Sequence, residues 1–521
     1  MLYNYNREIG VCQELFLKNL NLIKNIAFRD KMCYYIIYNF IYGDCMKRSS
    51  GVLMHVSSLF GNYSVGAFGE EARYFIDFLA DCGFGYWQVL PFCMPDEFNS
   101  PYKSYSAFGA NPWFIDLPTL YEAGLLTAEE LERARQNTPY LAEYERSGER
   151  IALLKLAAGR VKDRSAVLDF MKEYPELERA AGFLALREAN GNRPWQEWEC
   201  LEPDGDLLFA YRFIQYEFFR QWKNIKEYAN SRGVKIIGDI PIYVALDSAD
   251  VYYHKEDFLL DSHGYPTAVA GVPPDYFSEE GQLWGNPLYD YKKMKSDGYL
   301  WWRERTEYML RLFDGVRIDH FRGFESYWSI PAGSASAKAG KWVKGPGMAL
   351  VRAIKSVAGD RLVIAEDLGD ITPAVAALLK SSRLPGMRVF QFGFLGDGDS
   401  THLPHNYPEN SVAYSGTHDN NTLLGYVWEL SPDVRRRVFD YCGERSEDFA
   451  LGVESIVRAV MRSHAALAVF PVQDLLGFGS DTRMNTPGRA SGNWQYRITR
   501  GQLDSIDKRR LREMNKLYAR M

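Results

Sequence analysis

The chain has 521 residues and a net charge of −6, with 46% hydrophobic and 25% charged residues. This length suits one large barrel domain with insertions, or two or three smaller domains, and the composition is that of an ordinary globular protein. A mildly acidic chain gives no reason to expect binding to nucleic acid or to an anionic membrane. Aromatic residues make up 15% of the chain. That share fits a sugar-binding cleft lined by stacking platforms, although most of these rings are expected in the core.

The seven cysteines are odd in number, scattered, and without a Cys-x-x-Cys pair. This spacing argues against a zinc site or a disulfide framework and indicates a reducing compartment, so a cytoplasmic location is expected. No apolar stretch approaches the roughly 18 residues that a membrane-spanning helix needs.

The first 45 residues are rich in Asn, Tyr, Ile and Lys, whereas the remainder is richer in Ala, Arg and Gly. Residues 32–42 are apolar, but Asn39 interrupts them, and the ordered parts of a signal peptide are missing. We expect Met46 to be the true start, with residues 1–46 an extension outside the fold and 47–521 the catalytic domain. The alternative is a poorly ordered extension that is translated.

Strand-like and helix-like segments alternate along most of the chain. Residues 51–55 predict a strand, and residues 70–82 an amphipathic helix in which Phe75, Ile76 and Leu79 share one stripe. The other expected strands are short apolar runs at residues 86–90, 235–238, 315–318, 362–365, 388–392, 412–414 and 468–471. Repeated strand–helix units of this kind predict an α/β fold, a (β/α)8 TIM barrel.

Residues 117–205 interrupt this alternation with helical runs at 127–135, 151–158, 165–174 and 176–189. We therefore expect a mainly helical subdomain inserted between barrel strands. The chain ends in a polar segment, residues 501–521, that predicts a helix, and no C-terminal β-sandwich is encoded.

A charged pair follows one of the expected strands. Arg317 and Asp319 are two residues apart, so strand alternation points them to the same side. An arginine beside a carboxylate keeps that carboxylate ionised, as the nucleophile of a glycosidase or glycosyltransferase must be. A purely structural ion pair at a strand end is the alternative.

Two later motifs also place acids at strand ends. Glu366 and Asp367 follow an apolar strand, and His418 and Asp419 lie in a polar loop after another. Three acid-bearing motifs in this order fit one site at the mouth of a parallel barrel. Asp367 points the opposite way from Glu366 along the strand, so no direct chemistry is expected of it.

With these motifs the chain resembles the 4-α-glucanotransferases (amylomaltases or disproportionating enzymes) of glycoside hydrolase family 77, in the α-amylase clan. The resemblance runs from about Ser49 to Met521. Its most family-specific part is residues 273–287, Pro-Pro-Asp-Tyr-Phe-Ser-Glu-Glu-Gly-Gln-Leu-Trp-Gly-Asn-Pro. The other matching segments are residues 51–59, 86–91, 100–107, 238–244 and 483–488.

The resemblance implies a retaining double displacement with three carboxylates in named roles. Asp319 matches the nucleophile, oriented by Arg317. Glu366 matches the acid/base, which needs a raised pKa that burial can provide. Asp419 matches the carboxylate that holds the 2- and 3-hydroxyls of the distorted sugar, and His418 is expected to hydrogen-bond the same ring.

The resemblance also implies further substrate-binding residues. Asp239 matches an aspartate that supports the site, and Tyr102 a platform stacked on the transferred sugar. Gln282 and Trp284 would line the subsites from a lid-like irregular loop, residues 273–287, for which a structural Ω-loop is the alternative. Asn485 matches an asparagine near the same cleft.

The function implied is transfer of an α-1,4-glucan segment from a maltooligosaccharide to the 4-hydroxyl of another glucan or of glucose. The expected partners are maltooligosaccharides, starch- or glycogen-type glucans and glucose, with no cofactor and no metal; residues 397–399 fit a solvated turn better than a calcium site. An α-1,4-glucan hydrolase and an inactive glucan-binding protein remain open. A nucleotide-dependent glycosyltransferase is disfavoured because no Gly-rich phosphate loop is present. Transfer over hydrolysis rests on the resemblance, since it requires exclusion of water.

Overall fold

The computed structural model describes residues 46–521 apart from 96–97, 275–278, 397 and 490. The expectations for residues 1–45 and for part of the turn at 397–399 therefore lie outside the described residues. Arg48–Met521 form one structural unit. Within the described chain, no helix is both long and apolar enough to cross a bilayer.

The predicted (β/α)8 barrel is confirmed. Eight parallel strands close in the order β1-β12-β11-β10-β9-β6-β3-β2. They are buried along almost their whole length, as parallel strands covered by helices must be. Their bounds are β1 (Ser49–Leu53), β2 (Tyr86–Gln88), β3 (Lys235–Ile240), β6 (Gly315–Ile318), β9 (Leu362–Ala365), β10 (Gly386–Val389), β11 (Ser411–Tyr414) and β12 (Leu467–Pro471).

Helices follow most of these strands. The predicted stripe of Phe75, Ile76 and Leu79 is fully buried on the first of them, which ends at Gly83 in the left-handed conformation (φ 80°). The main helices around the barrel are α3 (Glu70–Cys82), α9 (Gly205–Ser231), α12 (Leu300–Leu312), α13 (Met348–Ala358), α14 (Pro373–Ser382), α15 (Leu423–Glu429), α16 (Pro432–Cys442), α17 (Phe449–Arg462) and α20 (Lys508–Leu517).

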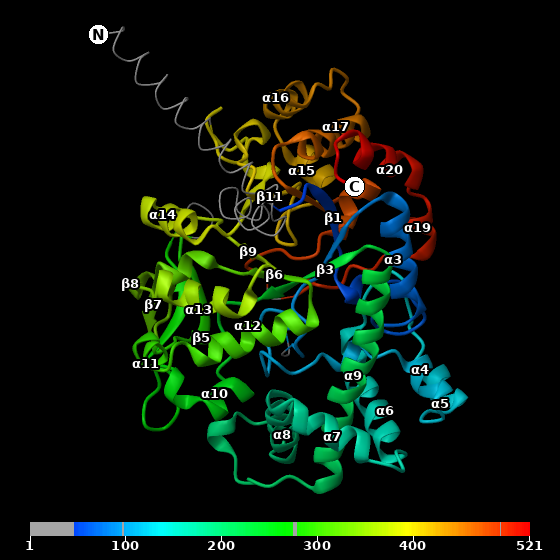
Figure 1. Cartoon of the computed structure of the whole chain (residues 1–521), viewed down its shortest axis with the longest axis vertical. Helices are drawn as coiled ribbons and strands as arrows, with labels where there is room; N and C mark the ends of the chain where they lie inside the picture. The colour runs from blue at the N-terminus through cyan, green and yellow to red at the C-terminus, as the bar shows by residue number, and fades with distance from the viewer. Residues whose placement is uncertain (1–45, 96–97, 275–278, 397, 490) are drawn as a thin grey trace, which may run out of the picture. The chain divides into compact units, whose positions relative to one another are not determined.

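A helical insertion lies between β2 and β3, where the sequence breaks its alternation. Three of its helices pack against the long helix α9 (Figure 1). Two of them meet where Tyr174 leaves helical geometry and Pro175 begins the next helix, a position proline favours. The helices are α4 (Leu117–Glu122), α5 (Ala128–Arg133), α6 (Ser147–Gly159), α7 (Ser165–Glu173) and α8 (Pro175–Ala189).

A four-stranded antiparallel sheet, formed by two insertions on either side of β6 in the chain, is absent from the sequence-based expectation. Its strands are β4 (Ala268–Val272), β5 (Gln282–Pro287), β7 (Ser326–Pro331) and β8 (Lys341–Lys344), in the order β5-β4-β7-β8. The expectation of an irregular loop is thus wrong for Gln282–Pro287. Pairing with β4, including a register shift next to Gly271, makes this Gly- and Pro-containing segment a strand.

Two further boundaries differ from expectation. The strand expected at 388–392 lies at Gly386–Val389, and Phe390–Phe392 form a 3-10 helix instead. The prediction of a single C-terminal helix is wrong. Two helices are present, because α19 (Arg500–Asp504) ends before Asp507, which caps the start of α20. The buried Arg520 side chain then donates to the carbonyl of Ser49, which fastens this segment to β1.

Candidate active site

Arg317 lies at the centre of the barrel mouth and joins two carboxylates. On β6, its Nη2 donates to Asp319 Oδ1 at 2.7 Å and its Nε donates to Asp239 Oδ2 at 2.9 Å. The Tyr102 hydroxyl donates to the same Asp239 oxygen at 2.7 Å. Burial raises the pKa of Asp239, and the Arg317 guanidinium opposes that rise. The predicted side-by-side orientation of Arg317 and Asp319 is confirmed.

Glu366 follows the neighbouring strand β9 and is held by backbone amides. The amides of His320 and Leu368 donate to its two carboxylate oxygens, at 2.6 and 2.8 Å. Burial and the nearby Asp319 charge raise the pKa of Glu366 to about 8. A carboxyl group with that pKa keeps its proton at neutral pH, beside an aspartate paired with arginine.

Asp367 points away from this pair, as strand alternation predicts. It accepts from the Met387 amide at 2.6 Å and from Arg388 Nη1 at 2.8 Å. These contacts tie β9 to β10 and give Asp367 a structural role.

The third acid, Asp419, is presented by the loop between β11 and α15. Its side chain is about half exposed (48%), and His418 Nε2 lies 3.4 Å from its Oδ2. Asn485 Nδ2 donates to Asp419 Oδ1 at 2.6 Å, although the two residues come from different loops. The His418 ring stacks on Tyr102, with centroids 5.1 Å apart and planes 17° from parallel. Tyr102 therefore links the loop of Asp419 to the Arg317 cluster.

Gln282 and Trp284 reach the site from β5 of the antiparallel sheet. Trp284 Nε1 donates to Gln282 Oε1 at 3.0 Å, and the indole packs edge-on against His320, 5.0 Å between centroids. His320 follows Asp319 directly and its amide binds Glu366, so a single residue, His320, links Trp284 to the two central acids. The structure thus connects all ten residues predicted from sequence through direct contacts or a single intervening residue.

Sequence reasoning missed several residues of the same site. His320 adopts a left-handed conformation (φ 50°), which is uncommon outside glycine, and burial lowers its pKa to about 4, so its ring is neutral. Arg483 Nη2 donates to the backbone carbonyl of Asp419 at 2.5 Å. Trp494 lies 5.9 Å from Tyr102 and 5.8 Å from His418, ring to ring. A signal existed only for Arg483, which opens the family-like segment 483–488.

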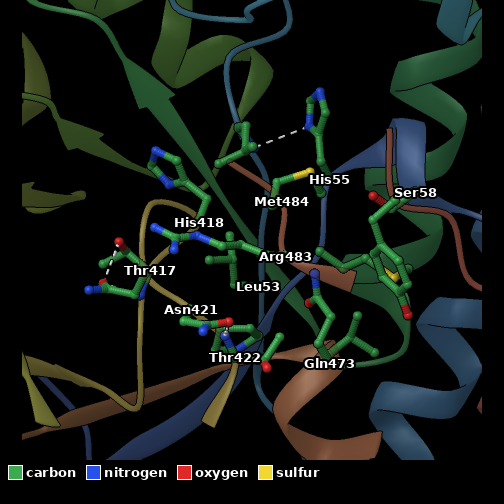
Figure 2. Close-up of a pocket in the computed structure, with 16 residues that line it drawn as sticks. Leu53, His55, Ser58, Thr417, His418, Asn421, Thr422, Gln473, Arg483 and Met484 are labelled. Carbon is green, nitrogen blue, oxygen red and sulfur yellow. Dashed lines mark hydrogen bonds between the residues drawn. The ribbon is translucent and has the colours of Figure 1, made fainter. Parts of the chain in front are cut away.

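A small cavity lies beneath the loop of His418 and Asp419. Its volume is about 20 Å³, and its lining includes Thr417, His418 and Thr422 from this loop together with Gln473 and Arg483 (Figure 2). Roughly one water molecule fits a space of this size. Among the described residues, no group of three or more His, Cys, Asp or Glu side chains is arranged to hold a metal ion.

A closed parallel barrel that carries an arginine-paired aspartate and a buried glutamic acid with a raised pKa at the carboxyl ends of neighbouring strands is the arrangement expected of a glycoside-processing enzyme. Comparison with known proteins agrees. A family model described as 4-alpha-glucanotransferase matches residues 54–503.

Curated relatives and solved structures cover nearly the same span. The 4-alpha-glucanotransferase of Streptococcus pneumoniae serotype 4 is 42% identical over 498 residues, covering 91% of this chain and 98% of that protein. The Thermus thermophilus 4-alpha-glucanotransferase is 43% identical over 499 residues, with 91% and 100% coverage. The structure of Streptococcus agalactiae amylomaltase in complex with acarbose superposes with a TM-score of 0.87 at 35% identity, covering 91% of this chain and all of that one. The chain belongs to glycoside hydrolase family 77, the 4-alpha-glucanotransferases.

Proposed function

We infer that this enzyme transfers α-1,4-glucan segments between maltooligosaccharides through a covalent glycosyl-enzyme. The single observation that supports the chemistry best is the contrast between Asp319 and Glu366. Asp319 accepts from a buried guanidinium, while burial raises the pKa of Glu366. Two carboxyl groups whose surroundings differ in this way suit the roles of nucleophile and general acid.

In the first half-reaction, Asp319 attacks the anomeric carbon of the donor. Arg317 orients that carboxylate through a charge-assisted hydrogen bond, and its guanidinium is itself fixed by the buried Asp239. Glu366 gives its proton to the glycosidic oxygen, and the shortened glucan leaves with a free 4-hydroxyl. The bond from the anomeric carbon to the leaving oxygen breaks as the bond to Asp319 forms.

In the second half-reaction, Glu366 is a carboxylate and takes the proton of the acceptor's 4-hydroxyl. That oxygen attacks the anomeric carbon, the ester to Asp319 breaks, and configuration is retained. Asp419 and His418 hold the hydroxyls of the reacting sugar, and Asn485 fixes the Asp419 carboxylate. Tyr102 contributes a ring face beside His418 on which the sugar stacks.

Transfer over hydrolysis requires that water be kept from the intermediate. Trp284, whose indole packs edge-on against His320, supports this part of the proposal because a bulky ring against the residue that follows Asp319 leaves less room there for water. The substrates proposed are maltooligosaccharides, longer starch- or glycogen-type glucans, and glucose as an acceptor. A cytoplasmic location is proposed from the thiols of Cys82, Cys93, Cys200 and Cys442, all four of which are free.

Incubation with pure maltotriose tests the proposal. A transferase produces glucose together with a ladder of longer oligosaccharides, whereas an α-1,4-glucan hydrolase produces only shorter sugars. An inactive binding protein produces neither. Asp319→Ala should abolish both products while the variant stays folded, and an unchanged ladder from that variant would overturn the assignment of the nucleophile.

A further inference from the structure

The loop of residues 415–423 carries His418 and Asp419 from the end of β11 to the first residue of α15. Its tip must place both side chains against the donor sugar within a fraction of an ångström for full activity. The position of the tip depends on how the two ends of the loop are held. Both ends are buried, and both contact one residue outside the loop.

That residue is Asp474, on the short helix α18 (Val472–Leu476) that directly follows β12. The hydroxyl of Ser415, the first loop residue, donates to Asp474 Oδ2 at 2.6 Å. The amide of Leu423, the last loop residue, donates to Asp474 Oδ1 at 2.7 Å. One carboxylate therefore spans the base of the loop with both of its oxygens.

The surroundings of Asp474 make its ionised form energetically unfavourable. Its exposed fraction is 3%, and burial raises its pKa to about 7, against which only the Ser415 hydroxyl and the Leu423 amide act. Both are neutral donors, so the group gains no salt bridge from them. The contribution of Asp474 is to accept two hydrogen bonds, one from each end of the loop. An apolar side chain would leave both donors without this partner.

The segment after β12, which contains Asp474, also holds the tip of the loop. Farther along it, Arg483 Nη2 donates to the Asp419 carbonyl and Asn485 Nδ2 to the Asp419 carboxylate. Gln473 Nε2 donates to the carbonyl of Thr482 at 3.0 Å, which joins the two parts of this segment. The chain after β12 is thus bound to the loop after β11 at its base and at its tip.

The cavity of Figure 2 lies between these two segments. Thr417, His418 and Thr422 line it from the loop, and Gln473 and Arg483 from the segment after β12. His418 therefore borders a space shared with the segment that carries Asp474. A shift of the loop relative to that segment would change the surroundings of His418.

We propose that Asp474 is a positioning residue for the transfer reaction, which acts by holding Ser415 and Leu423 at the distance that places His418 and Asp419 against the donor sugar. It touches no substrate. We call the two hydrogen bonds from Ser415 and Leu423 to Asp474 the clamp. The effect of the clamp on catalysis rests on the proposed function, whereas the clamp itself does not.

Two substitutions at Asp474 distinguish a role in positioning the loop from a role in the stability of the fold alone. Asp474→Ala removes both acceptors and should lower kcat for maltotriose transfer by about 10- to 100-fold, the cost of a misplaced site residue. Asp474→Asn should keep kcat within about threefold of the parent, because the amide oxygen accepts from Leu423 while the amide nitrogen donates to Ser415 Oγ, which is able to accept. Ser415→Ala breaks half of the clamp with little risk to folding and should fall between the two.

The matched control is Asp257→Ala, which removes another buried carboxylate that accepts from Lys293 Nζ at 3.0 Å, far along the chain from the loop. It should lower stability and leave kcat of the folded enzyme unchanged. The proposal is overturned if folded Asp474→Ala and Ser415→Ala both retain the parental kcat, or if Asp474→Asn loses as much activity as Asp474→Ala.

Hydrogen–deuterium exchange of the peptide that contains residues 415–423 tests the clamp without any activity. Exchange should accelerate at least about tenfold in Asp474→Ala, remain near the parental rate in Asp474→Asn, and not change in Asp257→Ala. Equal exchange in all four proteins would refute the clamp. If the parent itself made no maltotriose ladder, the proposed function would fail, while the exchange rates would still decide whether Asp474 holds the loop.

Discussion

Asp239 Oδ2 accepts a hydrogen bond from Arg317 Nε at 2.9 Å with no part of the Asp239 side chain exposed. The same guanidinium donates to Asp319 Oδ1. One arginine thus balances two carboxylates, of which one is buried behind it and the other, at 30% exposure, faces the mouth of the barrel. The buried partner fixes the arginine, and the arginine fixes the reactive acid.

Asp239→Ala should destabilise the fold by about 3 kcal/mol at pH 7, because it leaves much of a buried guanidinium charge unpaired. Urea unfolding measures the loss. Tyr102→Phe is the comparison variant, since it keeps both charges of the ion pair and removes only a neutral hydroxyl, which donates to Asp239 and accepts from Arg317 Nη2. It should cost about 1 kcal/mol. Equal losses of stability in the two variants would show that pairing with Arg317 is not the main stabilising contribution of Asp239.

Transfer activity should fall on the alkaline side with an apparent pKa near 8, the value to which burial and Asp319 raise the pKa of Glu366. The general acid must carry its proton when the donor is cleaved, so kcat/KM should drop about tenfold for each pH unit above that value. A rate profile with maltotriose from pH 5 to about pH 10 measures this limb. An alkaline limb below about pH 6 would contradict the protonated state assigned to Glu366.

Glu366→Gln should trap the glycosyl-enzyme when α-maltotriosyl fluoride is the donor. Fluoride leaves without needing a proton, so the ester to Asp319 forms, but no base remains to activate the acceptor hydroxyl. Mass spectrometry of the digested protein should then find the added maltotriosyl group on the peptide that contains Asp319. The double variant with Asp319→Asn is the control and should carry none; label on another peptide would place the nucleophile elsewhere.

Trp284→Ala should raise the ratio of hydrolysis to transfer several-fold, since removing the indole packed on His320 opens the neighbourhood of Asp319 to water. The ratio is measured as new reducing ends against longer oligosaccharides. Trp428→Ala is a suitable control because Trp428, on α15, is 69% exposed and outside the site. An unchanged ratio of hydrolysis to transfer in Trp284→Ala would show that Trp284 does not exclude water from the site.

Asp474→Asn should flatten part of the pH dependence of stability. Burial raises the pKa of Asp474 to about 7, whereas an unfolded aspartate titrates near 3.9, so the folded state binds more protons between these values. The favourable contribution of this group is therefore complete below about pH 4 and is lost as pH rises to about 7. The Tm of Asp474→Asn relative to the parent should rise across that window, and thermal unfolding at pH 5 and pH 8 measures it. A constant difference in Tm would contradict a shifted pKa.

Local patterns are sufficient to find the central pair and the barrel. Alternation along β6 alone places Arg317 beside Asp319, and most barrel strands coincide with a short apolar run in the sequence. Helices α7 and α8 are predicted nearly to their ends because Pro175 marks the boundary between them. These features depend on neighbours within a few positions, which a single sequence displays directly.

The features that sequence reasoning misses depend on partners far along the chain. The strand at Gln282–Pro287 exists through pairing with β4, and its own Gly and Pro residues argue against it. The left-handed backbone of His320 accompanies the hydrogen bond from its amide to Glu366, 46 positions later, and no local residue pattern predicts it. Asp474 has no motif at all, because its two partners lie 59 and 51 positions away.

The backbone between Asp319 and Glu366 has a wider consequence. The Glu366 amide donates to the Ile318 carbonyl and the Phe321 amide to the Glu366 carbonyl, each at 3.0 Å, while the His320 amide holds the Glu366 side chain. The backbones that carry the two acids are therefore held at the spacing of adjacent strands, about 4.8 Å, from which the two side chains reach toward the 5–5.5 Å that retention demands of the carboxyl groups. The antiparallel sheet and the helical insertion are free to diversify in length and composition, altering which glucans are chosen, while the stereochemical outcome is preserved by main-chain geometry that few point mutations reach.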